Sequence, residues 1–251
     1  MVPPSRGIVF AAFCLSRLAA IVAVVLLALN VSASWAEEEK IPPCHEDAVV
    51  VFDASGSMSG NQILGIPNSR ARIDEARSAL ARVLPNATKF RRVGLVTYGP
   101  GPYNQCNVKV DLTPTSNAAS QIMDVVDALV PAGKTALTEA VEEAAKVLDY
   151  TKKPGVLVLV TDGEETCGRN PCELATRLQA NADQLTVHVI GFRYSNYSWT
   201  GSSVLDIRCL ADINNGLYIK ADSEAELIEA LEKTLDCPMV SQAPLNWKAL
   251  P

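Results

Sequence analysis

Residues 49–58 have the sequence VVVFDASGSM, in which four apolar residues are followed directly by Asp-x-Ser-x-Ser. The apolar part is short and rich in β-branched residues, which is typical of a buried strand. Asp53, Ser55 and Ser57 follow at its carboxyl end, and Gly56 lets the chain turn between the two serines without a Cβ clash. The stretch therefore predicts a strand that ends in a turn lined by oxygen-bearing side chains.

Two further segments carry the same kind of side chain. Residues 155–163 have the sequence GVLVLVTDG, which places Asp162 at the end of a second apolar strand. Thr135 follows Gly-Lys at the start of a helical pattern. In an open α/β sheet the loops beyond the carboxyl ends of neighbouring strands converge where the strand order reverses. We therefore expect Asp53 and Asp162 to meet there.

The candidate ligands of this site offer oxygen and neither nitrogen nor sulfur. They are Asp53, Ser55, Ser57, Thr135 and Asp162. An all-oxygen set suits a hard cation, which favours Mg²⁺ or Mn²⁺ over Zn²⁺, with Ca²⁺ as the less suited alternative. Two carboxylates and three hydroxyls would leave water on part of an octahedral Mg²⁺ and would neutralise it incompletely.

Strand and helix signals alternate along the chain, which favours an α/β fold with a mostly parallel sheet and helices on both faces. Strands are expected near residues 48–52, 92–98, 107–112, 155–161, 185–191 and 216–220. Helices are expected near residues 70–84, 117–129, 136–149, 171–182, 203–213 and 222–236. The link between the second and third strands is rich in Gly and Pro and has no helical pattern, so these strands are expected to pair antiparallel at the sheet edge.

The Asp-x-Ser-x-Ser run, the threonine and the Thr-Asp-Gly, in this order, resemble the metal-ion-dependent adhesion site of von Willebrand factor type A domains. The resemblance covers about residues 47–236. It implies a three-layer, doubly wound fold with a six-stranded sheet and one antiparallel edge strand. It also implies a protein partner that supplies an acidic side chain to the metal, without catalysis.

The same resemblance implies a role for each ligand. Ser55 and Ser57 would bind the metal directly, and Thr135 would move in or out with conformational state. Asp53 and Asp162 would supply charge, directly or through water.

The N-terminus has the pattern of a secretory signal peptide over residues 1–36. Two arginines accompany a 12-residue apolar run, Leu18–Leu29, and small residues precede a cleavage position after Ala36. The alternative is an uncleaved anchor, for which the run is short. We expect residues 37–46 to be a leader, 237–251 a flexible tail, and the protein to be periplasmic or secreted without a membrane span after cleavage.

Charge and cysteine content fit an exported, non-nucleic-acid-binding protein. The net charge is −6 and no basic run is present, which disfavours nucleic-acid binding. Cys14 lies in the signal, and an even number of cysteines remains for disulfides, which we favour over zinc. The six are Cys44, Cys106, Cys167, Cys172, Cys209 and Cys237.

Two disulfide arrangements stay open. The resemblance implies neighbouring domain ends, so Cys44–Cys237 is favoured in both. A local Cys167–Cys172 bridge would leave Cys106 to pair with Cys209. The alternative is Cys106–Cys167 with Cys172–Cys209.

Competing chemistry is weaker. Residues 128–135, ALVPAGKT, lack the first glycine and the preceding strand of a phosphate-binding loop, so nucleotide binding is not expected. Asp53 could be a nucleophile in a metal-dependent hydrolase or phosphatase-like enzyme, but Ser55 stands where a second aspartate is usual, and no Ser/His/Asp triad is apparent. A structural envelope protein that uses its metal only for stability is a third hypothesis.

Several rim residues are secondary candidates. Residues 61–69 and the aromatic loop 192–203 are candidate partner contacts, although simple packing is favoured for the latter. Glu164 and Glu165 are expected in a solvated loop. His188 lies in a strand pattern and is expected to be packed.

Overall fold

Six short strands form one sheet in the computed structural model, which describes residues 44, 46–64, 70–194 and 204–237. The strands are β1 (Asp47–Asp53), β2 (Val93–Tyr98), β3 (Val108–Thr115), β4 (Gly155–Thr161), β5 (Leu185–Phe192) and β6 (Tyr218–Ala221). Their order is β3-β2-β1-β4-β5-β6, and only β3 runs antiparallel to its neighbour. The predicted six-stranded sheet with one antiparallel edge strand is confirmed.

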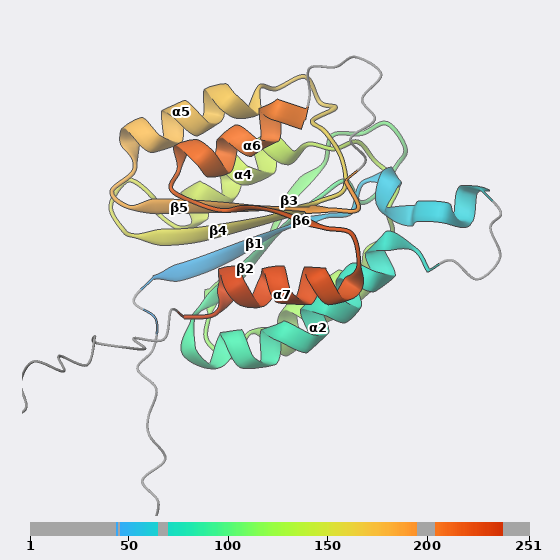
Figure 1. Cartoon of the computed structure of the whole chain (residues 1–251), viewed down its shortest axis with the longest axis horizontal. Coiled ribbons are helices and arrows are strands. Elements are labelled where there is room, and N and C mark those ends of the chain that lie inside the picture. Colours follow the sequence, from blue (N-terminus) through green and yellow to red (C-terminus); the bar gives the residue numbers. More distant parts are fainter. Residues whose placement is uncertain (1–43, 45, 65–69, 195–203, 238–251) are drawn as a thin grey trace, which may run out of the picture. The chain divides into compact units, whose positions relative to one another are not determined.

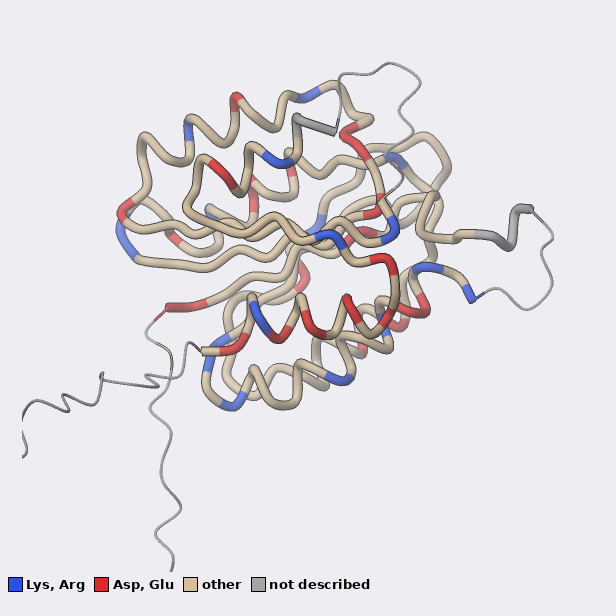
Figure 2. The backbone as a smooth tube through the Cα atoms, viewed as in Figure 1, with Lys and Arg blue, Asp and Glu red and all other residues tan. Residues whose placement is uncertain are grey.

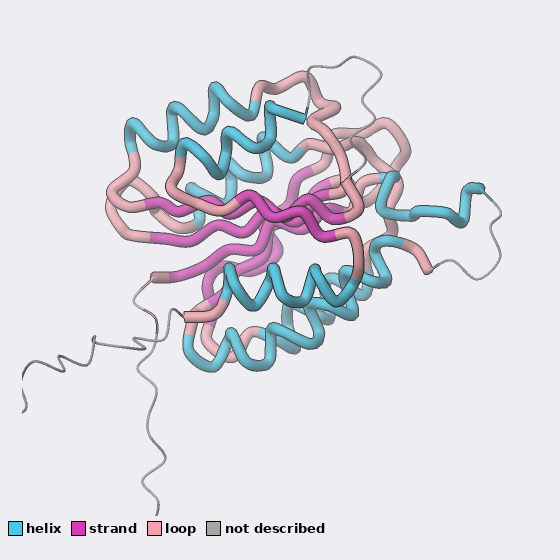
Figure 3. The backbone as a smooth tube through the Cα atoms, in the orientation of Figure 1, coloured by secondary structure: helices cyan, strands magenta, loops and turns pink. Residues whose placement is uncertain are grey.

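Helices cover both faces of this sheet (Figure 3). They are the 3₁₀ segment η1 (Gly56–Leu64) and the α-helices α2 (Arg72–Phe90), α3 (Ala119–Ala128), α4 (Leu137–Val147), α5 (Pro171–Asn181), α6 (Val204–Ile213) and α7 (Glu224–Leu235). Figure 1 shows α4, α5 and α6 on one side of the sheet and α2 and α7 on the other. This is the doubly wound, three-layer architecture expected from the sequence.

The alternation of side chains along β1 divides the core between the two faces. Val50 and Phe52 pack with apolar residues of α2, α3 and α7, whereas Val49 and Val51 pack with those of α4, α5 and α6. All four side chains are fully buried. A strand covered on both faces must be apolar throughout, which explains its continuous hydrophobic run.

The central position of β1 determines where the candidate site lies. β1 pairs with β2 on one side and with β4 on the other, both parallel. The chain leaves β1 at Asp53 and leaves β4 at Thr161, at the same edge of the sheet. The two predicted aspartates therefore follow adjacent strands, as the convergence argument requires.

Helix α2 is longer than its expected range of 70–84. It continues to Phe90 although Pro85 lies inside it. Proline removes a backbone donor and usually ends or kinks a helix, but here Ala87 and Thr88 are buried beyond it. Burial of this last turn outweighs the local cost of the proline. Segment η1 was not expected as a helix.

Three disulfides join the six described cysteines. Cys44–Cys237 connects the two ends of the domain, as favoured. The local Cys167–Cys172 bridge is wrong. Cys167 pairs with Cys106 and Cys172 with Cys209, which is the alternative arrangement. Asn170 caps α5 and starts a new helix between Cys167 and Cys172, so the two thiols serve different partners.

One expectation about loop residues is confirmed at one position and another is corrected. Tyr194, in the aromatic loop for which packing was favoured over partner contact, is 3% exposed and packs in the core beside α4–α6. Glu165, expected in a solvated loop, is partly buried, and its carboxylate accepts hydrogen bonds from the backbone N–H groups of Thr138 (2.9 Å) and Cys167 (2.6 Å). Residues 195–203 of the aromatic loop, the signal-like residues 1–36 and residues 238–251 lie outside the described residues.

The described residues contain no helix that is long and apolar enough to cross a membrane. Figure 2 shows acidic and basic residues interspersed along their outer helices. The described part therefore lacks the single-sign basic stripe that nucleic-acid binding uses.

Candidate metal centre

Asp53 anchors the candidate site from inside the protein. Its side chain is fully buried, and both oxygens accept hydrogen bonds. Oδ1 accepts from the backbone N–H of Ser55 (2.7 Å), which closes the turn after β1. Oδ2 accepts from the hydroxyls of Tyr98 (2.7 Å) and Thr161 (2.8 Å), on the flanking strands β2 and β4. Asp53 therefore fixes the positions of three strand ends.

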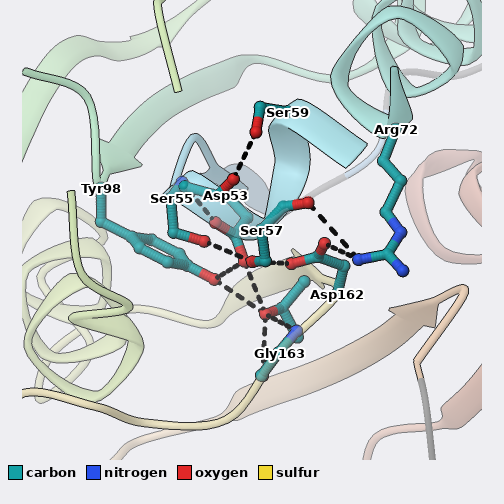
Figure 4. A network of polar contacts seen from close by, with 10 residues as sticks. Asp53, Ser55, Ser57, Ser59, Arg72, Tyr98, Asp162 and Gly163 are labelled. Atoms are coloured by element: carbon teal, nitrogen blue, oxygen red, sulfur yellow. Dashed lines mark hydrogen bonds and ion pairs between the residues drawn. The ribbon is translucent and has the colours of Figure 1, made fainter. Parts of the chain in front are cut away.

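A chain of oxygen atoms leads from the first turn to Asp162 (Figure 4). The Oγ atoms of Ser55 and Ser57 lie 3.0 Å apart. The Ser57 hydroxyl donates to Oδ1 of Asp162 at 2.6 Å, across 105 residues of sequence. The structure thus brings Ser55, Ser57 and Asp162 into direct contact, as the convergence of the β1 and β4 loops predicts.

Thr135 approaches the same point from a third segment. Its loop is tied to the first turn by a hydrogen bond from Gly56 N–H to Gly133 O at 2.9 Å. A Cβ placed on Gly163 would lie 3.7 Å from Ser57 Oγ and 3.8 Å from Thr135 Oγ1. The two hydroxyls therefore face a common space beside the Gly163 backbone. All five predicted site residues lie at one rim of the sheet.

The electrostatics of the site are dominated by two carboxylates removed from water. Burial, followed by the negative charge of Asp53, raises the pKa of Asp162 to about 6. Burial also raises the pKa of Asp53 above its usual value, against the opposing effect of its hydrogen bonds. Because like charges in a low dielectric repel, the site is short of positive charge.

Arg72 supplies one compensating charge. Its Nη1 lies 2.8 Å from Asp162 Oδ2, and its side chain is 30% exposed. One guanidinium faces two buried carboxylates, so a deficit of one positive charge remains when both are ionised. A divalent cation beside Ser57 and Asp162 would more than offset it.

The donor set fits a hard divalent cation. Ser55, Ser57, Thr135 and Asp162 present oxygen atoms to one region, which is the chemistry that Mg²⁺ and Mn²⁺ prefer. Among the described residues, no cluster of three or more His, Cys, Asp or Glu side chains could hold a metal ion. Any ion at this rim would therefore depend on hydroxyl ligands and water as well as on carboxylates.

Sequence reasoning missed three residues that support the site. Tyr98 and Thr161 end the strands on either side of β1, and their hydroxyls reach Asp53. A polar residue at the end of an apolar strand was the available signal for both. Arg72 begins α2, and nothing in its local sequence indicates contact with Asp162.

The chain is similar in sequence to proteins without an assigned role. One is the uncharacterized protein YwmC of Bacillus subtilis (strain 168), which is 27% identical over 206 residues, 78% of this chain and 85% of the relative.

Solved structures of similar shape have low sequence identity. The vWF domain of the type V pili tip protein Mfa5 from Porphyromonas gingivalis has a TM-score of 0.55 at 14% identity, and the match covers 77% of this chain and 94% of that one. Proximal thread matrix protein 1 from the mussel byssus, solved with a zinc-occupied metal-ion-dependent adhesion site, has a TM-score of 0.53 at 19% identity, covering 78% and 48%. At these identities the likeness shows the fold alone.

The family comparison agrees with the fold. Residues 48–165 match the family described as von Willebrand factor type A domain, a range that includes all five predicted site residues. Residues 48–165 are thus similar to von Willebrand factor type A domains, and the solved neighbours agree with that similarity in fold.

Proposed function

We propose that this protein binds a divalent cation of the Mg²⁺ type at the rim, through Asp53, Ser55, Ser57, Thr135 and Asp162, and uses it to bind a protein partner outside the cytoplasm. Mn²⁺ would substitute for Mg²⁺. The partner would complete the coordination with an acidic side chain, because two carboxylates and three hydroxyls leave positions to water.

The observation that carries the proposal is the contact between Ser57 and Asp162. The Ser57 hydroxyl lies 2.6 Å from the buried Asp162 carboxylate and 3.0 Å from the Ser55 hydroxyl. Three oxygen atoms that could bind a metal, from two distant segments, therefore lie at one point. The raised pKa of Asp162 reflects charge that burial and Asp53 leave uncompensated. A cation would relieve this repulsion.

The surroundings of the site support contact with a protein. Tyr103 and Val130 are 81% and 70% exposed, the largest exposed fractions among the large apolar side chains of the described residues. They lie on two rim loops, which an isolated antiparallel β-bridge between Pro100 and Pro131 brings side by side. Exposed tyrosine is favoured at protein interfaces. Apolar side chains next to a metal would suit a partner segment that carries an acidic residue beside an apolar one.

An extracytoplasmic location agrees with the disulfides. Three of them link the described cysteines, and disulfides persist chiefly in oxidising compartments. The signal-like pattern of residues 1–36 supports the same location.

A nucleophilic role for Asp53 is disfavoured by its geometry. The side chain is fully buried, and each carboxylate oxygen is held by hydrogen bonds from Ser55, Tyr98 or Thr161. A nucleophile must reach its substrate, so the hydrolase hypothesis would need a different reacting group.

The test is a calorimetric titration of Mg²⁺ and Mn²⁺ into the metal-free protein, its Ser57→Ala variant and a Ser59→Ala control. Ser57 is exposed and contacts Asp162, whereas Ser59 donates to Gly56 O in the same turn, outside the ligand set. We expect saturable binding that weakens by about tenfold or more in Ser57→Ala and stays unchanged in Ser59→Ala.

Two outcomes would contradict the proposal. Absence of binding to the folded protein, or equal binding by both variants, would remove the metal from this site. Binding with full affinity followed by unfolding on chelation would favour the structural role instead. Partner capture that a chelator abolishes without unfolding would support the adhesion role.

A further inference from the structure

The loop that carries Thr135 is held on both sides by hydrogen bonds to other rim loops. On one side, Lys134 N–H donates to Gln105 O at 2.9 Å. On the other side, Thr135 N–H donates to Thr166 Oγ1 at 2.8 Å, and Thr166 N–H donates to Thr135 O at 2.9 Å. Thr135 therefore sits between two segments that belong to separate parts of the sequence.

The residues next to these contacts are joined covalently. Cys106 follows Gln105, Cys167 follows Thr166, and the two cysteines form a disulfide with a Cα–Cα distance of 5.9 Å. The disulfide thus joins the two loop segments that hold Thr135, here called the arms: the one that ends at Gln105 and Cys106, and the one that contains Thr166 and Cys167. No strand or helix contains either cysteine.

Glu165 ties the same arm to the helix that follows Thr135. Its carboxylate accepts hydrogen bonds from Cys167 N–H and from Thr138 N–H in the first turn of α4. The segment next to Cys167 therefore holds residues 135–138 at both ends, through Thr166 at Thr135 and through Glu165 at Thr138.

We propose that the Cys106–Cys167 disulfide positions Thr135 for cation binding, and that a thiol reductant that opens it weakens binding while the fold remains. Two reductant thiols would be oxidised to a disulfide, and the bridge would be reduced to two cysteine thiols. This inference rests on the proposed metal function. It adds a redox control of that site, with Thr135 as the ligand affected.

Access and location favour this bridge over the other two. Cys106 is the one exposed cysteine among those described, whereas the other five are partly buried. The bridge joins two loops at the rim, so its loss leaves the sheet, its helices and the two remaining disulfides in place. Opening would loosen the arms locally, and local opening of loops needs far less free energy than global unfolding.

The experiment compares Cys106→Ser/Cys167→Ser with the matched control Cys172→Ser/Cys209→Ser. The control removes a bridge between α5 and α6, which lies outside the Thr135 contacts. Amide hydrogen exchange of Thr135 and Thr166 is measured in the metal-free proteins, and Mn²⁺ affinity by calorimetry. We expect faster exchange at both amides and about tenfold weaker Mn²⁺ binding in the first variant only, the scale typical of lost support around a metal ligand.

A double-mutant cycle with Thr135→Val separates positioning from general loosening. If the bridge acts through the threonine hydroxyl, removing the bridge in the Thr135→Val background should cost no further Mn²⁺ affinity. Treating the wild type with a dithiol should reproduce the effect of Cys106→Ser/Cys167→Ser.

The inference is overturned if the bridge variant keeps wild-type exchange and affinity, or if the control loses affinity equally. Additive losses in the cycle would also overturn it. Failure of the wild type to bind Mn²⁺ would refute the proposed function, and the exchange of Thr135 in the metal-free proteins would still decide whether the bridge positions it.

Discussion

The two ends of the sheet differ in how the charges of their buried side chains are balanced. At the carboxyl ends of the strands, Asp53 and Asp162 bring like charges together, and one guanidinium, that of Arg72, pairs with Asp162. At the amino ends, Arg91 lies among carboxylates of opposite sign, 3.8 Å from Glu46 in a cavity of about 560 Å³. Under the proposed function a cation completes the first arrangement, whereas the second lies beside the Cys44–Cys237 disulfide that joins the two ends of the domain. We therefore expect changes at the rim to alter binding and changes at the opposite end to alter stability.

The largest effect should come from the bridge at the amino-end edge. Cys44–Cys237 spans 193 residues, and a loop of that length gives up to about 5 kcal/mol in the chain-entropy model. Replacing both cysteines by serine should lower the free energy of unfolding by about 3–5 kcal/mol. Urea denaturation of the metal-free protein measures this loss.

The comparison fails if this variant loses Mn²⁺ affinity while it is still folded. Such a result would mean that the two ends are coupled through the sheet. Unchanged affinity with a much lower denaturation midpoint would confirm that closure and binding are separate.

Most of the fold could be predicted because it depends on local patterns. The strand at residues 155–161 is found where it was expected, and the Gly- and Pro-rich link correctly indicated the antiparallel edge. The end of α2 could not be predicted, because Pro85 is a local signal that tertiary burial of Ala87 overrides.

The candidate site divides in the same way. The juxtaposition of Ser57 and Asp162 was predictable, since both follow parallel strands that the alternation of elements makes neighbours. The contact of Arg72 with Asp162 was not, because it depends on how α2 packs across the sheet rather than on any local pattern. The pairing of Cys167 with Cys106 likewise depends on where two loops lie in space.

Arg72→Met tests whether the rim is short of positive charge, because it removes the one guanidinium that pairs with Asp162. Removing the guanidinium 2.8 Å from Asp162 leaves the two carboxylates without their compensating charge. The metal-free protein should lose about 2 kcal/mol of stability, because a largely buried carboxylate loses its partner. Mn²⁺ should bind several-fold more tightly, since the competing cation is gone, as calorimetry would record.

Arg70→Met is the matched control for this prediction. Arg70 pairs with Glu224 on the exposed surface, 2.8 Å apart, away from the two aspartates. An exposed pair contributes about 0–1 kcal/mol, so stability and Mn²⁺ affinity should both stay close to wild type. Weaker Mn²⁺ binding by Arg72→Met would instead make Arg72 part of the binding site.

The two ends should respond oppositely to acid in the metal-free protein. Burial, followed by the positive charge of Arg91, lowers the pKa of His188 to about 4 from its ordinary 6.5. Below pH 6.5 His188 binds a proton in the unfolded chain but stays neutral in the folded chain. The free energy of unfolding therefore falls as the pH falls towards 4. The pKa of Asp162 is raised from 3.8 to about 6, so the folded chain binds a proton more tightly here than the unfolded chain does. The contribution of Asp162 to the stability of the protein is therefore lost as the pH rises from about 4 to 6.

His188→Gln separates these opposing contributions. Nδ1 of His188 accepts a hydrogen bond from Leu217 N–H at 3.0 Å, which a glutamine oxygen could replace. The other charged groups around the cavity, Glu46, Glu232, Lys233 and Asp236, remain. The wild-type minus variant difference in unfolding free energy should fall by about 1–2 kcal/mol between pH 6.5 and 4, a discounted value because the imidazole is partly solvated. A flat difference would assign the neutral histidine no role in stability.

The smallest effect is expected at Tyr103, where the rim carries an apolar side chain that the fold does not use. Because this side chain is 81% exposed, Tyr103→Ser should change the free energy of unfolding by less than about 0.5 kcal/mol. Mn²⁺ affinity should also be unchanged, since Tyr103 lies outside the ligand set. A tyrosine that contributes to neither stability nor metal binding would be available for partner contact. A substantial loss in either measurement would instead mean that the loop around Tyr103 supports the metal centre, and the boundary between site and interaction surface would have to be moved.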